Sequence, residues 1–149
     1  LAGLAVVPAV FTLAGFDWWQ AYRLLVTRYY QGAGGTRPYG YWVWANLACT
    51  VLITGPATVA GLRRTGVVLV HRRTGSRDDV RLGLLVVASL LALLIADLSG
   101  MSKAETERIW LPFAMWLLPA CAFLTRPRAW LAAQALLALL LNHLLVTGW

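Results

Sequence analysis

The sequence predicts an all-α fold, namely a polytopic transmembrane helix bundle with about five hydrophobic segments and one interfacial helix. Hydrophobic residues make up 60% of the chain and charged residues 13%, whereas soluble domains carry about 25% charged residues. The apolar residues also cluster into long runs, and residues 82–96 contain no ionisable side chain. Because backbone groups in lipid must be satisfied within their own segment, each run is expected to be helical.

The five hydrophobic segments are expected near the following residues: 1–16, 41–62, 82–98, 109–124 and 130–147. A bilayer core needs about 20 apolar residues per helix, so the first and fourth segments are short for a full span. The chain opens on Leu1 inside an apolar run. We therefore expect residues 1–149 to be a single transmembrane region from a longer membrane protein.

Basic residues in the connections predict the orientation of these segments. Residues 63–81 and the link before the fifth segment together carry eight arginines, against five basic residues on the opposite side. Cytoplasmic loops are enriched in lysine and arginine. The loop 63–81 is thus predicted to be cytoplasmic, and residues 17–40 and 97–108 extracytoplasmic.

The net charge of +7 comes from basic residues in short loops between apolar runs. This placement favours anionic lipid head groups as partners over nucleic acid. Cys49 and Cys121 lie within apolar runs and lack the spacing of a metal site or a disulfide framework. The sequence therefore predicts no metal site and no evident cofactor.

Residues 17–30 show aromatic and aliphatic positions at helical spacing, which predicts an interfacial helix with Asp17 as its N-cap. An aromatic belt that only anchors the chain is the alternative to a functional surface. The glycine-rich residues 31–36 then deliver Arg37 and Tyr39 to the second segment. This stretch is interpreted either as a phosphate-approaching turn or as a flexible loop, with the loop favoured.

Residues 102–113 contain the sharpest local pattern. Ser102 and Glu105 have the spacing of a capping box, which predicts that a helix begins there. On such a helix Glu105 could pair with Arg108, and Lys103 with Glu107. Pro112 and Pro119, further along, are expected to interrupt the helix.

Arg108 is the main candidate for binding a lipid-linked phosphate, with Arg37 and Lys103 beside it. A guanidinium grips a phosphate through two hydrogen bonds and keeps its charge. The alternative is an interfacial arginine that pairs with Glu105 or Asp97. Glu105, Glu107 and Tyr39 are the expected supporting residues, and no catalytic residue can be assigned.

Four further polar residues lie in the apolar runs: Asn46, Gln134, Asn142 and His143. Such residues usually hydrogen-bond between packed helices. His143 has no second potential ligand nearby in the sequence, so a packing residue or an interface residue is favoured over a metal ligand.

Two parts of the chain resemble the late transmembrane helices of bacterial, largely actinobacterial, glycosyltransferases of the GT-C type. The resemblance covers about a third of the chain and rests on these residues: Ser102 to Phe113 with Glu105, Glu107, Arg108, Ile109 and Trp110, Arg28 to Gly32, Arg37 to Tyr39, and Tyr41 with Trp42.

The resemblance implies transfer of a sugar from polyprenyl phosphate at the extracytoplasmic face of the cell membrane. In that superfamily an acidic residue of the first extracytoplasmic loop acts as base or ligand of a divalent metal, and that loop would lie upstream of Leu1. Upstream helices of the complete protein are then implied as partners. A non-enzymatic integral membrane subunit or a transporter part is the alternative function.

Overall fold

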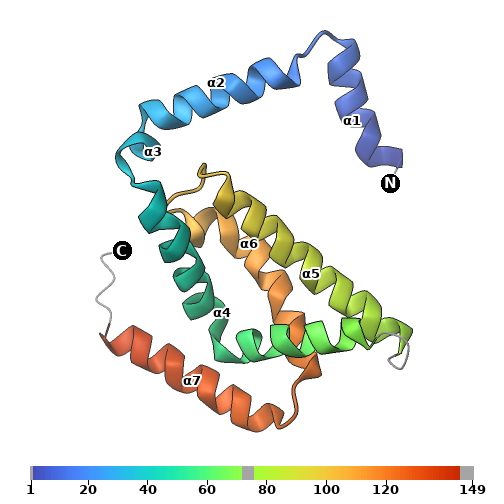
Figure 1. Cartoon of the computed structure of the whole chain (residues 1–149), viewed down its shortest axis with the longest axis vertical. Helices are drawn as coiled ribbons and strands as arrows, with labels where there is room; N and C mark the ends of the chain where they lie inside the picture. The colour runs from blue at the N-terminus through green and yellow to red at the C-terminus, as the bar shows by residue number, and fades with distance from the viewer. Residues whose placement is uncertain (1, 72–75, 145–149) are drawn as a thin grey trace. The chain divides into compact units, whose positions relative to one another are not determined.

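Helices account for all the regular structure in residues 2–71 and 76–144, the ranges that the computed structural model describes (Figure 1). The elements follow in chain order: α1 (Ala2–Leu13), α2 (Trp18–Gln31), α3 (Ala33–Thr36), α4 (Tyr39–Val70), α5 (Arg77–Leu98), η1 (Thr106–Trp110), α6 (Leu111–Ala114), η2 (Met115–Phe123) and α7 (Pro127–Leu144). The chain divides into two compact units, Leu1–Pro38 and Tyr39–Trp149.

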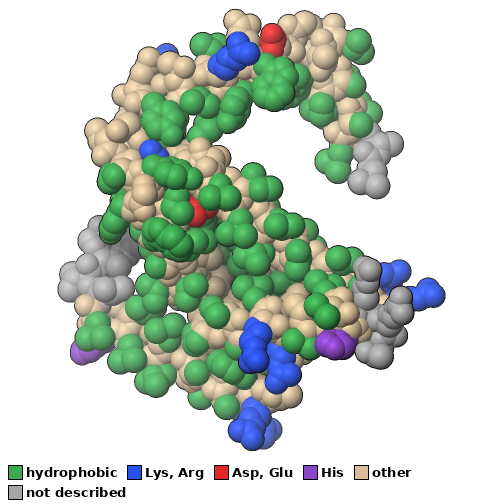
Figure 2. All heavy atoms as spheres, viewed as in Figure 1, with side chains coloured by type: hydrophobic (Ala, Val, Ile, Leu, Met, Phe, Trp, Pro, Cys, Tyr) green, Lys and Arg blue, Asp and Glu red, His purple; other side chains and the backbone are tan. Residues whose placement is uncertain are grey.

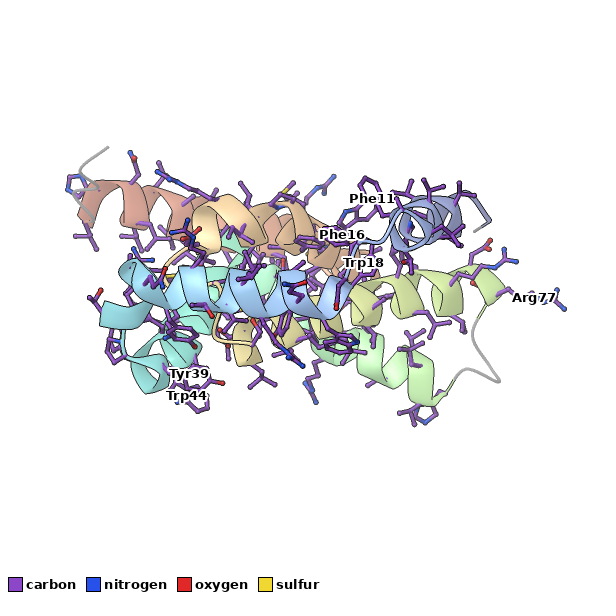
Figure 3. The ribbon with its side chains drawn as sticks, turned by 90° about the horizontal axis from the view of Figure 1, so that it is seen from above. Phe11, Phe16, Trp18, Tyr39, Trp44 and Arg77 are labelled. Atoms are coloured by element: carbon purple, nitrogen blue, oxygen red, sulfur yellow. The ribbon has the colours of Figure 1, made fainter. Side chains whose placement is uncertain are left out.

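In the first unit, aromatic rings join α1 to α2. The indole of Trp18 packs edge-on against Phe16, with ring centroids 4.7 Å apart, and its Nε1 donates to the Thr12 hydroxyl at 2.8 Å. Phe11 contacts both rings at the same corner (Figure 3). Asp17 accepts a hydrogen bond from the Gln20 backbone at 2.9 Å, which confirms it as the N-cap of α2.

Part of the glycine-rich stretch after α2 forms a short helical turn, α3, where the sequence favoured a loop. Gly34 is buried, and a β-carbon there would overlap the ring of Tyr29. A residue with no side chain is therefore required where the turn folds back on α2.

Helix α4, at the start of the second unit, is broken in its middle. Gly55 has φ 78° and ψ 172°, a conformation that is essentially restricted to glycine. Pro56 follows it and has no backbone N–H to continue the helix, but suits the first position of a new one. The ribbon accordingly changes direction at this point (Figure 1). The predicted segment 41–62 thus lies within a helix that bends at Gly55 and Pro56.

Threonines line the buried face of α4. Thr50, Thr54 and Thr58 each donate from their hydroxyl to the carbonyl four residues earlier, at 2.7–2.8 Å. All three side chains are buried. Because the acceptors belong to α4 itself, these hydroxyls are satisfied without help from another helix.

Helix α5 begins after its N-cap, Ser76, and carries the predicted segment 82–98. The Ser76 hydroxyl accepts from the Asp79 backbone at 3.0 Å, and Asp78 and Asp79 suit the positive end of the helix dipole. Helices α4 and α5 are long and apolar enough to cross a membrane, and Leu4–Leu13 and Arg108–Phe123 are shorter apolar helices. The bundle of five segments remains a prediction.

The fourth predicted segment, 109–124, is helical up to Phe123 but changes helix type along its length, so its prolines alter the hydrogen-bond pattern without interrupting the helical run. A π-helical turn, η1, leads into the single α-helical turn α6, which contains Pro112. The 3-10 helix η2 follows and contains Pro119. Each proline removes one backbone donor from the α-helical pattern, which explains why no regular α-helix forms here.

The core of the second unit lies where this irregular segment packs against α4 and α5. Its members are buried hydrophobic residues, with Leu47, Leu62 and Leu90 packed around them: Val86, Leu93, Trp110, Ala114, Leu117 and Ala120. Small residues bring the backbones together, since a β-carbon on Gly61 of α4 would lie 2.6 Å from the Ala120 carbonyl oxygen.

Helix α7 docks on the break in α4 through one side chain. The Gln134 amide nitrogen donates to the Thr54 carbonyl at 3.0 Å, and its oxygen accepts from the Ala57 backbone at 3.4 Å. The amide thus occupies the space over Gly55, where a β-carbon would overlap it. Residues 145–147 of the predicted fifth segment lie outside the described residues.

Candidate functional site

A buried polar cluster joins α4, the end of α5 and the loop that leads into η1, and the amide of Asn46 lies at its centre. The Asn46 nitrogen donates to Asp97 Oδ1 at 3.0 Å and to the Ser102 carbonyl at 3.4 Å. The Asn46 oxygen accepts from the Ala104 backbone at 3.3 Å and the Thr106 hydroxyl at 3.2 Å. One amide on α4 therefore fixes the positions of three other segments of the chain.

Ser102 belongs to this cluster and does not cap a helix, so the predicted capping box is wrong. Its hydroxyl donates to the Ala96 carbonyl at 3.2 Å and accepts from the Trp110 indole at 3.0 Å. The chain turns at Ala104, where φ is 59°, and helical structure begins only at Thr106. The Ser102 hydroxyl, which the capping-box pattern assigned to the helix N-terminus, thus bonds to Ala96 and Trp110 instead.

The cluster is isolated from solvent although it contains charged side chains. Asp97 is 3% exposed and Lys103 is 5% exposed. No buried side-chain nitrogen or oxygen lacks a hydrogen-bond partner in the described part of the chain. Ionisable residues inside an apolar helical unit are rare and usually functional. Here their complete satisfaction indicates that they hold the loop 99–105 in one conformation.

Arg108 lies on the outside of this assembly, two residues before the buried Trp110. Its side chain is exposed, and within residues 2–71 and 76–144 the structure records no ion pair to its guanidinium. The alternative role, an ion pair with Glu105 or Asp97, is thus not seen among the described residues. Glu105 contributes its carbonyl, which accepts from the Arg108 and Ile109 backbones at 3.2 and 2.9 Å. The Glu107 side chain lies outside the described residues.

The three predicted phosphate-binding residues occupy different environments. Lys103 is buried in the cluster, whereas Arg108 is exposed. Arg37, half-buried at the end of α3, belongs to the first unit. Tyr39 is exposed on α4 and donates to the Leu98 carbonyl at 3.0 Å, so it braces the end of α5. Of the two candidates in the second unit, Arg108 is therefore the one with an exposed side chain.

Sequence reasoning treated Asp97 only as a partner for Arg108 and did not single out Thr106. Asp97 is an isolated carboxylate at the end of an apolar run, which could have indicated a buried partner such as Asn46. Thr106 gave no signal that could have identified it.

No group of three His, Cys, Asp or Glu side chains gathers as metal ligands in the described parts of the chain. Cys49 and Cys121 are free and half-buried, and the Cys121 sulfur lies 3.8 Å from the Thr58 hydroxyl. His143 and Asn142 are exposed on α7. Of the two roles favoured over metal binding for His143, a packing residue or an interface residue, packing is therefore not seen among the described helices.

No protein-family model, curated protein or solved structure matches this chain.

Proposed function

We propose that this chain is the membrane-embedded C-terminal region of a glycosyltransferase that uses a polyprenyl-phosphate-linked sugar at the extracytoplasmic face. The observation that carries the proposal is an exposed Arg108 on a segment that buried Asn46 and Asp97 hold in place. Among the described side chains no carboxylate pairs with the Arg108 guanidinium, and such an exposed guanidinium can bind a phosphate with two hydrogen bonds.

The membrane setting rests on the apolar character of the helices. Helices α4 and α5 have the length and composition of membrane spans. We propose α1, residues 106–123 and α7 as further membrane-embedded segments. Helix α2 exposes aromatic side chains such as Trp19 and Tyr22, as suits a helix in the head-group layer. The arginine-rich stretch 63–81, which includes the end of α4 and the start of α5, then lies on the cytoplasmic side, so Arg108 faces the opposite compartment.

In this arrangement each site residue has a distinct role. Arg108 binds the lipid phosphate, and Arg37 is a separate candidate within the first unit. Lys103, being buried, supports the loop from within and does not touch the ligand. The family resemblance implies that an acidic residue of the first extracytoplasmic loop, which this proposal does not assign to any residue of the chain, acts as base or as ligand of a divalent metal.

A non-enzymatic membrane subunit or transporter part is the second candidate. The break at Gly55 and Pro56 favours it, because discontinuous helices with freed backbone groups commonly form substrate sites in transporters. In this chain, however, the Gln134 amide occupies the freed groups at Thr54 and Ala57. The break therefore has a structural explanation that needs no substrate.

The test is the affinity of the full chain, in nanodiscs, for polyprenyl phosphate. Arg108→Gln is expected to weaken binding by about tenfold, because one charge-assisted pair contributes about 1.5–3 kcal/mol. Arg108→Lys keeps the charge but loses the two parallel N–H donors of the guanidinium, so its affinity should lie between those of the wild type and Arg108→Gln. Arg77→Gln, at an exposed arginine in the first turn of α5, is the matched control and should bind as the wild type does. Equal affinity of Arg108→Gln and the wild type would refute the site.

A further inference from the structure

An apolar groove of about 510 Å³ runs between the first half of α4 and helix α7. Helix α4 contributes Leu52, Ile53 and Gly55, and α7 contributes a stripe that includes Leu131 and Ala138. The only polar side chain in the lining is Gln134, and its amide already bonds to the backbone of α4. The groove therefore offers hydrocarbon contacts along its length and suits an alkyl chain.

One end of the groove is cationic. Arg128 lies one helical turn before Leu131 on α7, so the two side chains share a face. Arg126 precedes the helix, and Arg63 and Arg64 lie on the second half of α4. All four arginines are exposed. Basic side chains gather over the second half of α4 and the start of α7 (Figure 2).

No acidic side chain compensates these arginines from their own helices. Neither α4 nor α7 contains an aspartate or glutamate. Arg81 of α5 is different, because its guanidinium lies 3.3 Å from the Asp78 carboxylate. The end of the groove thus carries positive charge that a bound anion can neutralise.

An alkyl groove that ends in uncompensated arginines matches a molecule with an anionic head and a hydrocarbon tail. We propose that the groove between α4 and α7 binds one acyl chain of an anionic phospholipid, and that Arg126 and Arg128 bind its phosphate. The site lies on different residues from Arg108 and takes a bulk membrane lipid, so it is independent of the function proposed above. Gly55 and Gln134 form part of the wall of the groove. The bound acyl chain therefore also covers the contact between α4 and α7.

The test is retention of lipid by the full 149-residue chain, measured by native mass spectrometry. Phosphatidylglycerol and phosphatidylcholine with identical acyl chains are compared, with glycerol phosphate as the soluble head group alone. The wild type should retain phosphatidylglycerol in preference. Arg126→Gln and Arg128→Gln should each reduce that preference by about fivefold. Arg81→Gln, at an arginine with its own acidic partner, is the matched control and should leave it unchanged.

A second variant, Ala138→Trp, fills the groove and leaves every arginine in place. It should reduce retention of phosphatidylglycerol, while thermal unfolding in lipid-free detergent stays close to that of the wild type. Equal retention of the two lipids by the wild type would overturn the proposal. It would also be overturned if glycerol phosphate bound as tightly as the lipid, or if Ala138→Trp changed only dimer formation, since the groove would then hold a second copy.

Discussion

Removing the amide of Asn46 should destabilise the second unit more than any other single polar substitution in it. Asn46→Ala deletes four hydrogen bonds, which join α4 to Asp97, Ser102, Ala104 and Thr106. Side-chain hydrogen bonds between helices in membranes contribute about 0.6 kcal/mol each on average. Four bonds give about 2.4 kcal/mol, and the buried partners left unpaired raise the cost to about 3–4 kcal/mol.

The assay is the free energy of unfolding in mixed micelles, titrated with a denaturing detergent and followed by tryptophan fluorescence. Asn142→Ala, at an exposed asparagine on α7, is the matched control and should change stability by less than about 0.5 kcal/mol. Asn46→Asp keeps the shape but loses both donors and places a second carboxylate against Asp97, so it should also destabilise. A loss at Asn46 no larger than at Asn142 would refute the view that this amide organises the loop.

Two further predictions concern the break in α4 and the topology. Gly55→Ala should destabilise the chain by more than about 2 kcal/mol in the same unfolding assay, because the new β-carbon would overlap the Gln134 amide and φ at this position is 78°. Gly66→Ala is the control. A β-carbon there meets nothing within 4 Å, so this substitution should stabilise the chain by about 0.5–1 kcal/mol. A smaller loss at Gly55 than at Gly66 would contradict the structure of the break. Ser76→Cys, in a chain with Cys49 and Cys121 replaced by alanine, should react with an impermeant thiol reagent only after intact cells are permeabilised; labelling without permeabilisation would reverse the predicted orientation.

The elements that local sequence determines were predicted well. The N-cap at Asp17 and the apolar run of α5 depend on neighbouring residues alone, and both are confirmed. The capping box at Ser102 failed because Trp110 and Ala96 take up the hydroxyl that the pattern requires. The capping-box pattern is present in the sequence, but in the fold the Ser102 hydroxyl bonds to residues outside that pattern.

The candidate site was predicted in part. Arg108 is exposed as a phosphate-binding residue must be, but Lys103 is buried. The pairing of Asn46 with Asp97 joins residues 51 positions apart, and no local pattern specifies such a contact. The break at Gly55 had a visible signal, since Gly55 and Pro56 are adjacent in an apolar run. The position of Gln134 over that break had none, because it depends on how α7 docks.

The hydrogen bonds from Gln134 to the break in α4 also determine when, during synthesis of the chain, this part of the fold can be completed. Gln134 is synthesised 80 positions after Thr54, whose carbonyl it binds. Until α7 leaves the ribosome, the freed backbone groups at Thr54 and Ala57 must be hydrated or held by another protein. The threonines of the same helix need no such help, since each already bonds within α4. Helix α4 can therefore form early in translation. Its bend gains the two hydrogen bonds from Gln134 only after α7 has been synthesised.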